Sequence, residues 1–128
     1  MSQPTKIELR PATRAAIDAM IGKPLPWRVR AWTIERAGEV LAVGGFAYQP
    51  NDVIAAFLVK KPGVEQYPVT LHRAGMLAMK EARRIGYRRI VATADKRTEA
   101  AERWLKRFGF EQVAVDGDQA WVWEAARA

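Results

Sequence analysis

The sequence predicts an α/β (α+β) fold with the element order β-α-β-β-β-α-β-α-β-β. Three observations support this prediction. The chain has 128 residues, of which 49% are apolar and 27% charged, as expected for one domain with its own core. Segments with the apolar pattern of strands alternate with segments of helical spacing. Gly, Pro, Asn and Asp lie between these segments, where turns are needed, so we interpret residues 1–128 as a single domain.

The first segment predicts a strand followed by a short helix. Apolar and polar side chains alternate over Lys6–Arg10, which indicates a half-buried strand that Pro11 closes. Thr13 is the predicted N-cap of the helix, and Gly22 is its predicted end. The apolar face of this helix consists of Ala16, Ile17, Met20 and Ile21.

Three strands are predicted in the middle of the chain. Arg30–Arg36 and Glu39–Tyr48 are rich in strand-forming residues, and Ala37-Gly38 between them predicts a hairpin turn. Gly44-Gly45 interrupts the second of these strands and indicates either a bulge or a close approach of two backbones. Val53–Val59 is almost continuously apolar, which predicts a central strand that is buried on both faces.

Two helices with a strand between them are predicted next. Thr70 is the predicted N-cap of the first helix, and Gly86 is its end. A buried strand follows over Arg89–Ala94, and Thr98 is the predicted N-cap of the second helix, which ends at Gly109. The apolar stripe of the first helix consists of Leu71, Ala74, Gly75, Ala78, Ala82 and Ile85. That of the second helix consists of Ala101, Trp104, Leu105 and Phe108.

The last segment predicts a second hairpin. Glu111–Val115 and Ala120–Glu124 flank Asp116-Gly117-Asp118, and Asp-Gly is a strong signal for a tight turn. Trp121 and Trp123 share one face of the last strand. We expect both rings to be buried, because such large apolar surfaces are usually covered.

The composition excludes several kinds of chemistry. The chain has no Cys, His72 is its only histidine and Ser2 is its only serine, which excludes disulfides, cysteine zinc sites and Cys or Ser nucleophiles. The net charge of +7 indicates anionic partners. No segment approaches about 18 consecutive apolar residues, and Met1–Arg10 lacks the apolar core of a signal peptide. We therefore expect a cytoplasmic protein that does not bind membranes.

The second half of the chain carries a resemblance to a known family. E-A-R-R-I-G-Y-R-R-I-V-A-T-A-D at residues 81–95 and A-E-R-W-L-K-R-F-G-F-E-Q-V at residues 101–113 resemble the GNAT N-acetyltransferase superfamily. The resemblance implies a GNAT-like mixed, largely antiparallel, twisted sheet with helices on both faces. It also implies acetyl-CoA as the cofactor, no metal, and direct attack on the thioester by the amine of an acceptor, which needs no side-chain nucleophile.

The resemblance also implies where acetyl-CoA binds. Members of the superfamily hold the pyrophosphate with backbone N–H groups at the start of the central helix, where the helix dipole favours anions. In this chain those N–H groups belong to Thr70, Leu71 and His72. The full set of residues that the resemblance assigns to the cofactor is Leu58, Val59, Lys60, Gln66, Thr70, Leu71, His72 and Thr98.

The chain departs from the superfamily pattern at positions that matter for chemistry. Val69 and Leu71 stand where small residues, mainly Gly, are expected in the pyrophosphate loop, and Pro68 has no N–H to donate. Leu105 stands where many members have a tyrosine that protonates the leaving thiolate. Val53–Val59 contains no Glu to act as a general base. No catalytic residue is therefore assigned.

Two other functions stay open. R-A-W-T-I-E-R-A-G-E-V-L-A-V-G-G at residues 30–45 and R-W-L-K-R-F-G-F at residues 103–110 resemble a GNAT-like family of tailed bacteriophages, which includes the internal-virion or morphogenesis protein of T7-like phages. This implies a catalytically silent protein of a phage particle, acting as a homo-oligomer or with a structural partner. Clustered Lys and Arg also predict nucleic-acid binding through the basic helices. The first prediction remains an acyl-CoA-dependent N-acetyltransferase with a degenerate pyrophosphate loop, whose activity these departures leave open.

Overall fold

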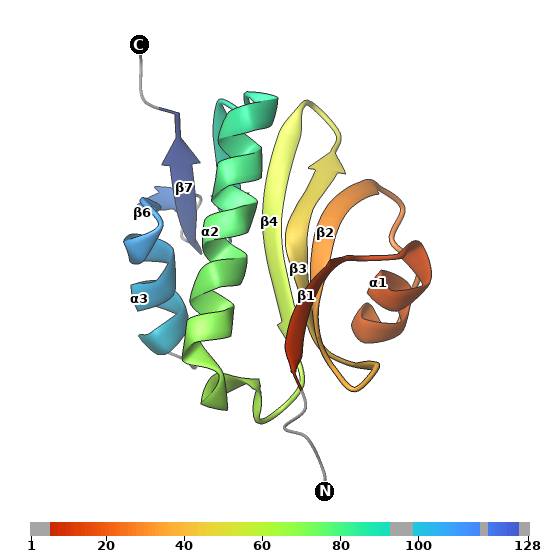
Figure 1. The fold of residues 1–128 in the computed structure, drawn as a ribbon. Coiled ribbons are helices and arrows are strands. Elements are labelled where there is room, and N and C mark those ends of the chain that lie inside the picture. The colour runs from red at the N-terminus through yellow and green to blue at the C-terminus, as the bar shows by residue number, and fades with distance from the viewer. Residues whose placement is uncertain (1–5, 93–98, 116–117, 126–128) are drawn as a thin grey trace, which may run out of the picture.

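The computed structural model describes residues 6–92, 99–115 and 118–125 (Figure 1). Within these ranges the order of strands and helices is the predicted one, with an added turn of 3-10 helix, η1, before the second α-helix. The elements are β1 (Ile7–Pro11), α1 (Arg14–Ile21), β2 (Arg28–Arg36), β3 (Glu39–Gln49), β4 (Val53–Lys60), η1 (Val64–Gln66), α2 (Pro68–Ile85), β5 (Arg89–Ala92), α3 (Glu99–Arg107), β6 (Glu111–Val115) and β7 (Asp118–Glu124).

The described strands form one sheet in the order β1-β2-β3-β4-β5-β7-β6. β4 and β5 are parallel, because α2 carries the chain back between them, and the other neighbouring strands are antiparallel. α1 covers one face of the sheet, and α2 and α3 cover the other, as Figure 1 shows. The structure thus confirms the predicted mixed, largely antiparallel sheet with helices on both faces.

The structure confirms the predicted ends of α1 and the first hairpin turn. Thr13 Oγ1 accepts a hydrogen bond of 3.1 Å from the N–H of Ala16, and Gly22 ends the helix with a φ of 87°. Ala37 and Gly38 have φ angles of 50° and 80°. Positive φ at both central residues is what a two-residue hairpin turn needs, and it joins β2 to β3 here.

Gly45 on β3 marks a close approach of two backbones. A Cβ at this position would lie 2.6 Å from the Cα of Ala31 and would clash with the carbonyl oxygen of Arg30 on β2. The bulge lies elsewhere, since the register of β2 against β3 shifts between Ile34 and Glu35. Of the two alternatives for Gly44-Gly45, the close approach is confirmed and the bulge is wrong.

The start of α2 differs from the prediction. The helix begins at Pro68, and Tyr67 at the N-cap makes no side-chain capping bond, so Thr70 is the third helical residue and not the N-cap. Proline is well suited to the first position of a helix, because its φ is already helical and the missing N–H would have no partner there. Gly86 ends the helix with a φ of 93°, as predicted.

One face of α2 packs closely against α3 and the sheet. Gly75, Met79 and Ala82 are buried. A Cβ on Gly75 would lie only 2.5 Å from Cζ of Phe108, so the absence of a side chain lets the two helices approach. Ile85 is expected in this stripe but is 39% exposed, because the buried side of α2 is the one that carries Gly75, Met79 and Ala82.

The core on the α2 side is aromatic. It joins Phe46 of β3 to Trp121 and Trp123 of β7 and to Leu105 of α3, all of them buried. The prediction that both tryptophans are buried is therefore confirmed. The predicted strand Arg89–Ala94 corresponds to β5 as far as Ala92, and Thr98 and the turn at residues 116–117 lie outside the described residues.

Candidate functional site

The end of β4 that leads to α2 carries exposed side chains at the centre of the sheet. β4 is central, but none of its residues is buried, which contradicts the prediction of a strand buried on both faces. Its described pairing with β5 is at Ala55 and Val91, and β4 continues for five residues beyond that point to Lys60. Leu58 in this extension is 41% exposed. The extension therefore offers accessible surface at the centre of the sheet, directly before the loop that leads to α2.

Glu65 occupies the loop that follows β4. Its carboxylate lies 3.0 Å from the ammonium of Lys60 and accepts a hydrogen bond of 3.2 Å from the N–H of Gly63. Its own backbone N–H, and then Lys60, hold the pKa of this carboxyl below its usual range. The carboxylate of Glu65 thus occupies the ammonium of Lys60 and the N–H of Gly63, in the loop where the resemblance places a pyrophosphate.

Few backbone N–H groups at the start of α2 are free for a ligand. The N–H of Gln66 donates to Gly63 and that of Tyr67 to Val64, at 3.2 and 2.9 Å, because η1 closes on itself. The N–H of Leu71 donates to the carbonyl of Tyr67 at 3.1 Å.

Pro68 has no N–H, so the first turn of α2 leaves those of Val69 and Thr70 without intrahelical acceptors. The expectation that Leu71 and His72 supply N–H groups to an anion is therefore wrong. Both residues lie beyond the part of the turn where donors are left over. The predicted contact of Thr70 with the cofactor stays a prediction, and Val69 is a second residue whose N–H has no intrahelical acceptor.

The remaining residues that the resemblance assigns to the cofactor lie in different surroundings. Val59 and Leu71 are half-buried and pack against the core on opposite faces of the sheet. Lys60 and Gln66 are exposed at the loop. The ring of His72 is half-buried and stacks on Phe108, with ring centres 5.4 Å apart. The structure thus keeps Leu58, Lys60 and Gln66 exposed on the β4–α2 segment, leaves Thr70 half-buried, and turns the other described members toward packing contacts.

The sequence analysis did not identify the contact between Arg36 and Tyr67, which lies beside this loop. The guanidinium of Arg36, at the end of β2, donates a 2.7 Å hydrogen bond to the hydroxyl of Tyr67. These residues are 31 positions apart, so only the folded sheet brings them together. Glu65 could have been noticed as an acidic residue within a segment proposed to bind an anion.

Half-buried Tyr48 of β3 and buried Tyr87, which follows α2, form a pair. The hydroxyl groups of Tyr48 and Tyr87 are hydrogen-bonded to each other. Burial, and then the bond to Tyr48, raise the pKa of Tyr87 well above its ordinary value, so this phenol stays protonated. Leu105, by contrast, is buried in the core and has no proton to donate. No acid or base is therefore assigned.

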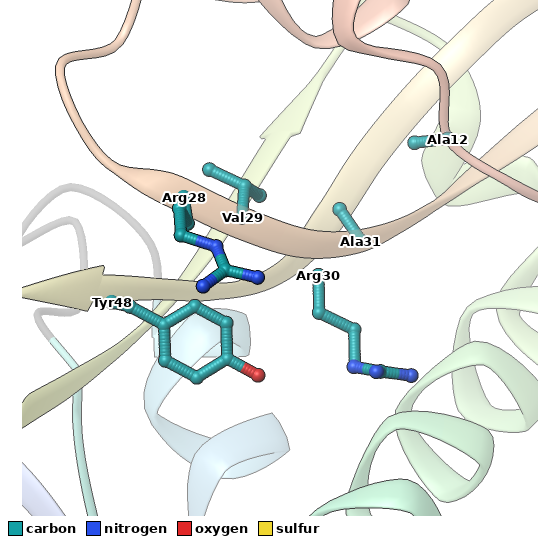
Figure 2. Close-up of a pocket in the computed structure, with 6 residues that line it drawn as sticks. All are labelled: Ala12, Arg28, Val29, Arg30, Ala31 and Tyr48. Carbon is teal, nitrogen blue, oxygen red and sulfur yellow. The ribbon is translucent and has the colours of Figure 1, made fainter.

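A cavity of about 520 Å³ lies at the edge of β2 (Figure 2). Pairing with β1 stops at Pro11 and Trp32, and the N–H of Ala12 makes the last bond, to Ala31, so the described chain leaves the preceding residues of β2 without a strand neighbour on this side. Figure 2 shows the side chains of Arg28, Arg30 and Tyr48 turned to the same side of β2. The cavity is lined by Ala12, Arg28, Val29, Arg30, Ala31 and Tyr48. Because β3 separates β2 from β4, this cavity is distinct from the open end of β4.

Metal-binding groups and membrane-spanning helices are both absent from the residues that the structure describes. No group of His, Asp or Glu there is arranged to hold a metal ion. No helix there is long and apolar enough to cross a membrane.

The arrangement of strands and helices is similar to that of several solved proteins. One is yncA of Salmonella typhimurium, a candidate acetyltransferase whose structure contains its cofactor acetyl-CoA: the identity is 16%, the TM-score 0.71, and 96% of each chain is covered. Another is an N-acetyltransferase of Staphylococcus aureus Mu50, with 15% identity, a TM-score of 0.70, and 93% of this chain and 98% of that chain covered. A Bordetella pertussis protein assigned to the GnaT family of acetyltransferases is 17% identical, with a TM-score of 0.58 and 98% of each chain covered.

No protein-family model and no curated protein matches the sequence. The likeness to solved structures extends over nearly the whole chain, and it shows the fold. The chain has the fold of the GNAT acetyltransferases, as the resemblance of its second half implies.

Proposed function

We propose that this GNAT-fold chain binds acetyl-CoA at the open end of β4 and transfers the acetyl group to an amine. The observation that carries the proposal is the fold, which is shared over 96% of both chains with a protein whose structure contains acetyl-CoA. The accessible extension of β4 and the free N–H groups of Val69 and Thr70 lie on the segment that the resemblance assigns to the cofactor.

The residues present fit acetyl-CoA in part. Two free N–H groups at the positive end of the 18-residue helix α2 suit a pyrophosphate. Lys60 adds a cation, but Glu65 shares it and also takes the N–H of Gly63. We therefore expect weaker binding of the phosphates than a glycine-rich loop gives, because here fewer donors face the ligand.

When bound, acetyl-CoA supplies a thioester, whose carbonyl carbon forms a bond to the acceptor nitrogen as the bond to sulfur breaks. The amine loses one proton in this step and the leaving thiolate gains one, so the reaction releases no net proton. This chain places no titratable side chain at the position of Leu105 to carry either proton. In the proposed reaction, water therefore exchanges both protons, and the contribution of the chain is to hold the thioester and the amine together.

Calorimetric titration with acetyl-CoA tests the binding step. Thr70→Asp places a negative charge beside the proposed phosphate position, so we expect about tenfold weaker binding, which corresponds to about 1.4 kcal/mol. An acidic residue in the first turn is favourable to the helix, so this variant should fold. Thr70→Asn is the matched neutral control and should bind like the original chain. Absence of binding at millimolar acetyl-CoA would refute the proposed function.

Release of free CoA tests the transfer step. Because the chain contains no Cys, any thiol that appears in a reaction mixture belongs to CoA. Incubation of the full chain with acetyl-CoA and a panel of primary amines should release thiol faster with an acceptor than without one. If acetyl-CoA binds but no amine increases thiol release, the chain is a binding protein and not a transferase.

The other two predicted functions and the cytoplasmic location stay predictions. One solved complex of similar fold, KacTA with DNA, matches with a TM-score of 0.56 and 10% identity, so the fold is compatible with a chain that works in a nucleic-acid complex. Filter binding of DNA and RNA at low and at physiological salt tests the nucleic-acid alternative. Binding to phosphates must weaken as the salt concentration rises, so absent or salt-independent binding would exclude this function. For a phage-particle role, the expected observation is a homo-oligomer or a stable structural partner.

A further inference from the structure

A groove of about 700 Å³ runs between α2 and the end of α3, on the face of the molecule where these two helices lie side by side (Figure 1). Its floor is Trp123 of β7, which is buried against the core. The groove is lined by His72, Met76, Leu77, Met79, Lys80, Arg83, Arg107, Phe108, Gly109 and Trp123. A volume of this size is within the range of known binding sites.

The lining is apolar and adaptable. Met76 is 55% exposed, which makes it one of the most exposed large apolar side chains of the described chain. Met79, Phe108 and Trp123 continue the apolar surface from Met76 toward the sheet. Methionine side chains are flexible and polarizable, and they fit apolar groups of different shapes. This part of the groove therefore suits aliphatic or aromatic anchors of a ligand.

Cations stand on both walls of the groove. Lys80 and Arg83 belong to α2, and Arg107 is the last residue of α3. None of the three has a carboxylate within ion-pair distance in the described part of the chain, and no Asp or Glu is among the residues that line the groove. The guanidinium of Arg83 lies 6.0 Å from the centre of the Trp123 ring. The groove thus has an apolar floor surrounded by positive charges, and none of the residues that line it carries a negative charge.

We propose that this groove binds an amphipathic helix of a partner protein, with apolar anchors on Met76, Phe108 and Trp123 and acidic residues facing the two walls. A groove between two helices accepts such a helix through anchors at successive turns. Complementary charge at the rim favours the correct partner and speeds association. The binding of this partner does not depend on acetyl transfer.

Two other occupants fit the groove less well. A second copy of the chain would bring another protein of net charge +7 against this basic rim, so self-association here is electrostatically opposed. Single-stranded nucleic acid prefers exposed aromatic faces on which bases stack, whereas here Trp123 is buried and the ring of Phe108 already packs against His72 and Trp104. Both remain distinguishable outcomes of the experiment.

Fluorescence anisotropy with labelled synthetic probes tests the proposal on the full chain. The first probe is a helical peptide of about 18 residues, long enough to form a helix, with Leu at successive turns and Glu beside them. The second has the same composition in scrambled order, and the third replaces each Glu by Lys. A single-stranded DNA oligonucleotide is the fourth. We expect binding of the first probe, with the other three at least about tenfold weaker, because affinity depends on a few central anchors.

Matched variants locate the binding site. Met76→Ser removes an apolar anchor and Arg83→Glu reverses a rim charge, so each should weaken binding of the first probe about tenfold. Ile85→Ser, on the opposite side of α2, and Arg89→Glu, on β5, make the same chemical changes outside the groove and should leave binding unchanged. Thermal unfolding of each variant checks that it is folded.

The results decide the proposal in either direction. Selective binding that both groove variants weaken and both control variants retain supports it. Equal binding of the ordered and scrambled acidic peptides would show charge attraction alone and overturn it. Failure of the first probe to bind, or preferential binding of the DNA oligonucleotide with the same sensitivity to Met76→Ser and Arg83→Glu, would overturn it as well.

Discussion

Gly75 lies at a close contact between α2 and the aromatic side chains at the end of α3. A Cβ here would lie 2.5 Å from Cζ of Phe108 and 2.8 Å from Cζ2 of Trp104. Both neighbours are ring atoms of side chains packed against the core, so they have little room to move. The small size of Gly75 therefore sets the distance between the helices, and with it the width of the groove above them.

We predict that Gly75→Ala destabilises the chain. Alanine favours a helix over glycine by up to about 1 kcal/mol, but overpacking of a core costs about 1–3 kcal/mol. The net expectation is a loss of about 1–2 kcal/mol in the free energy of unfolding, measured by urea denaturation. Arg73→Ala, at an exposed position of the same helix, is the control and should change stability by less than about 0.5 kcal/mol. A more stable Gly75→Ala variant would contradict the close packing.

Tyr87 makes stability depend on alkaline pH. The ordinary pKa of tyrosine is about 10, and in the folded chain burial and the bond to Tyr48 raise the pKa of Tyr87 above it. The folded state therefore holds this proton more tightly than the unfolded state. The resulting stabilisation is fully present below pH of about 10 and is lost as pH rises through and above that value.

The pH dependence can be measured by thermal unfolding from pH 8 to pH 11. We expect the original chain to lose stability above pH of about 10 more steeply than Tyr87→Phe, since the variant has no phenol to ionise there. Lysines also titrate in this range in both proteins, so the difference between the two slopes isolates Tyr87. Parallel slopes would show that the hydroxyl pair is not buried.

Glu65 is expected to compete with an anionic ligand for Lys60 and the N–H of Gly63. Glu65→Gln removes the negative charge and keeps the size of the side chain. We predict about threefold tighter binding of acetyl-CoA by calorimetry, a small gain because ion pairs at exposed sites are weak. Glu39→Gln removes the charge of another exposed glutamate, one paired with Lys61, and should have a smaller effect. Unchanged affinity in Glu65→Gln would remove Glu65 from the site.

At the scale of elements, the packing of β2 against β3 depends on Gly45 more than on Gly44. A Cβ on Gly45 would meet backbone atoms of Arg30 and Ala31, which cannot rotate away. A Cβ on Gly44 would lie 3.1 Å from the carbonyl oxygen of Phe57 on the other neighbour, β4, a contact that a small shift relieves. The two adjacent glycines thus provide an internal comparison within one strand.

We predict that Gly45→Ala lowers the free energy of unfolding by about 2 kcal/mol or more, as expected of overpacking against a rigid backbone. Gly44→Ala should cost less than about 1 kcal/mol. Urea denaturation of the two variants beside the original chain measures both. A larger loss in Gly44→Ala than in Gly45→Ala would reverse the assignment of the close approach.

Most elements of the fold could be predicted because their signals are local. The capping of α1 by Thr13 and the turn at Ala37-Gly38 depend on residues that are adjacent in the sequence. The predicted start of α2 lies three residues too late, because Thr70 is a good capping residue, whereas the helix uses Tyr67 as its N-cap and Pro68 as its first residue.

The site was harder to predict because it depends on contacts between distant segments. Which N–H groups of the loop are free is decided by η1, a turn that no periodicity marks. The contact of Arg36 with Tyr67 and that of Tyr48 with Tyr87 require the sheet to be assembled. The predicted burial of β4 is too high, since a continuous apolar segment does not show how much of each side chain its neighbours cover in the folded sheet.

At the scale of the whole molecule, the net charge of +7 should assist any anionic ligand. We predict that raising the salt concentration from about 0.05 to about 0.5 M lowers the affinity for acetyl-CoA, because ions screen the interaction between the exposed cations and the phosphates. Calorimetric titrations at several salt concentrations measure this. An affinity independent of salt would mean that apolar contacts of the pantetheine arm, and not the phosphates, dominate binding.

The open edge of β2 has a consequence for solubility. Where β1 turns away after Pro11, a short length of strand is left without a neighbour in the described structure. Such an edge is a template on which a strand of another molecule can add, and repeated addition leads to aggregation. Arg28 and Arg30 place two like charges on this length, and they would face the same two charges on an identical chain. The arginines that line the cavity thus also discourage edge-to-edge association of the sheet, which matters most when the protein is newly made and concentrated.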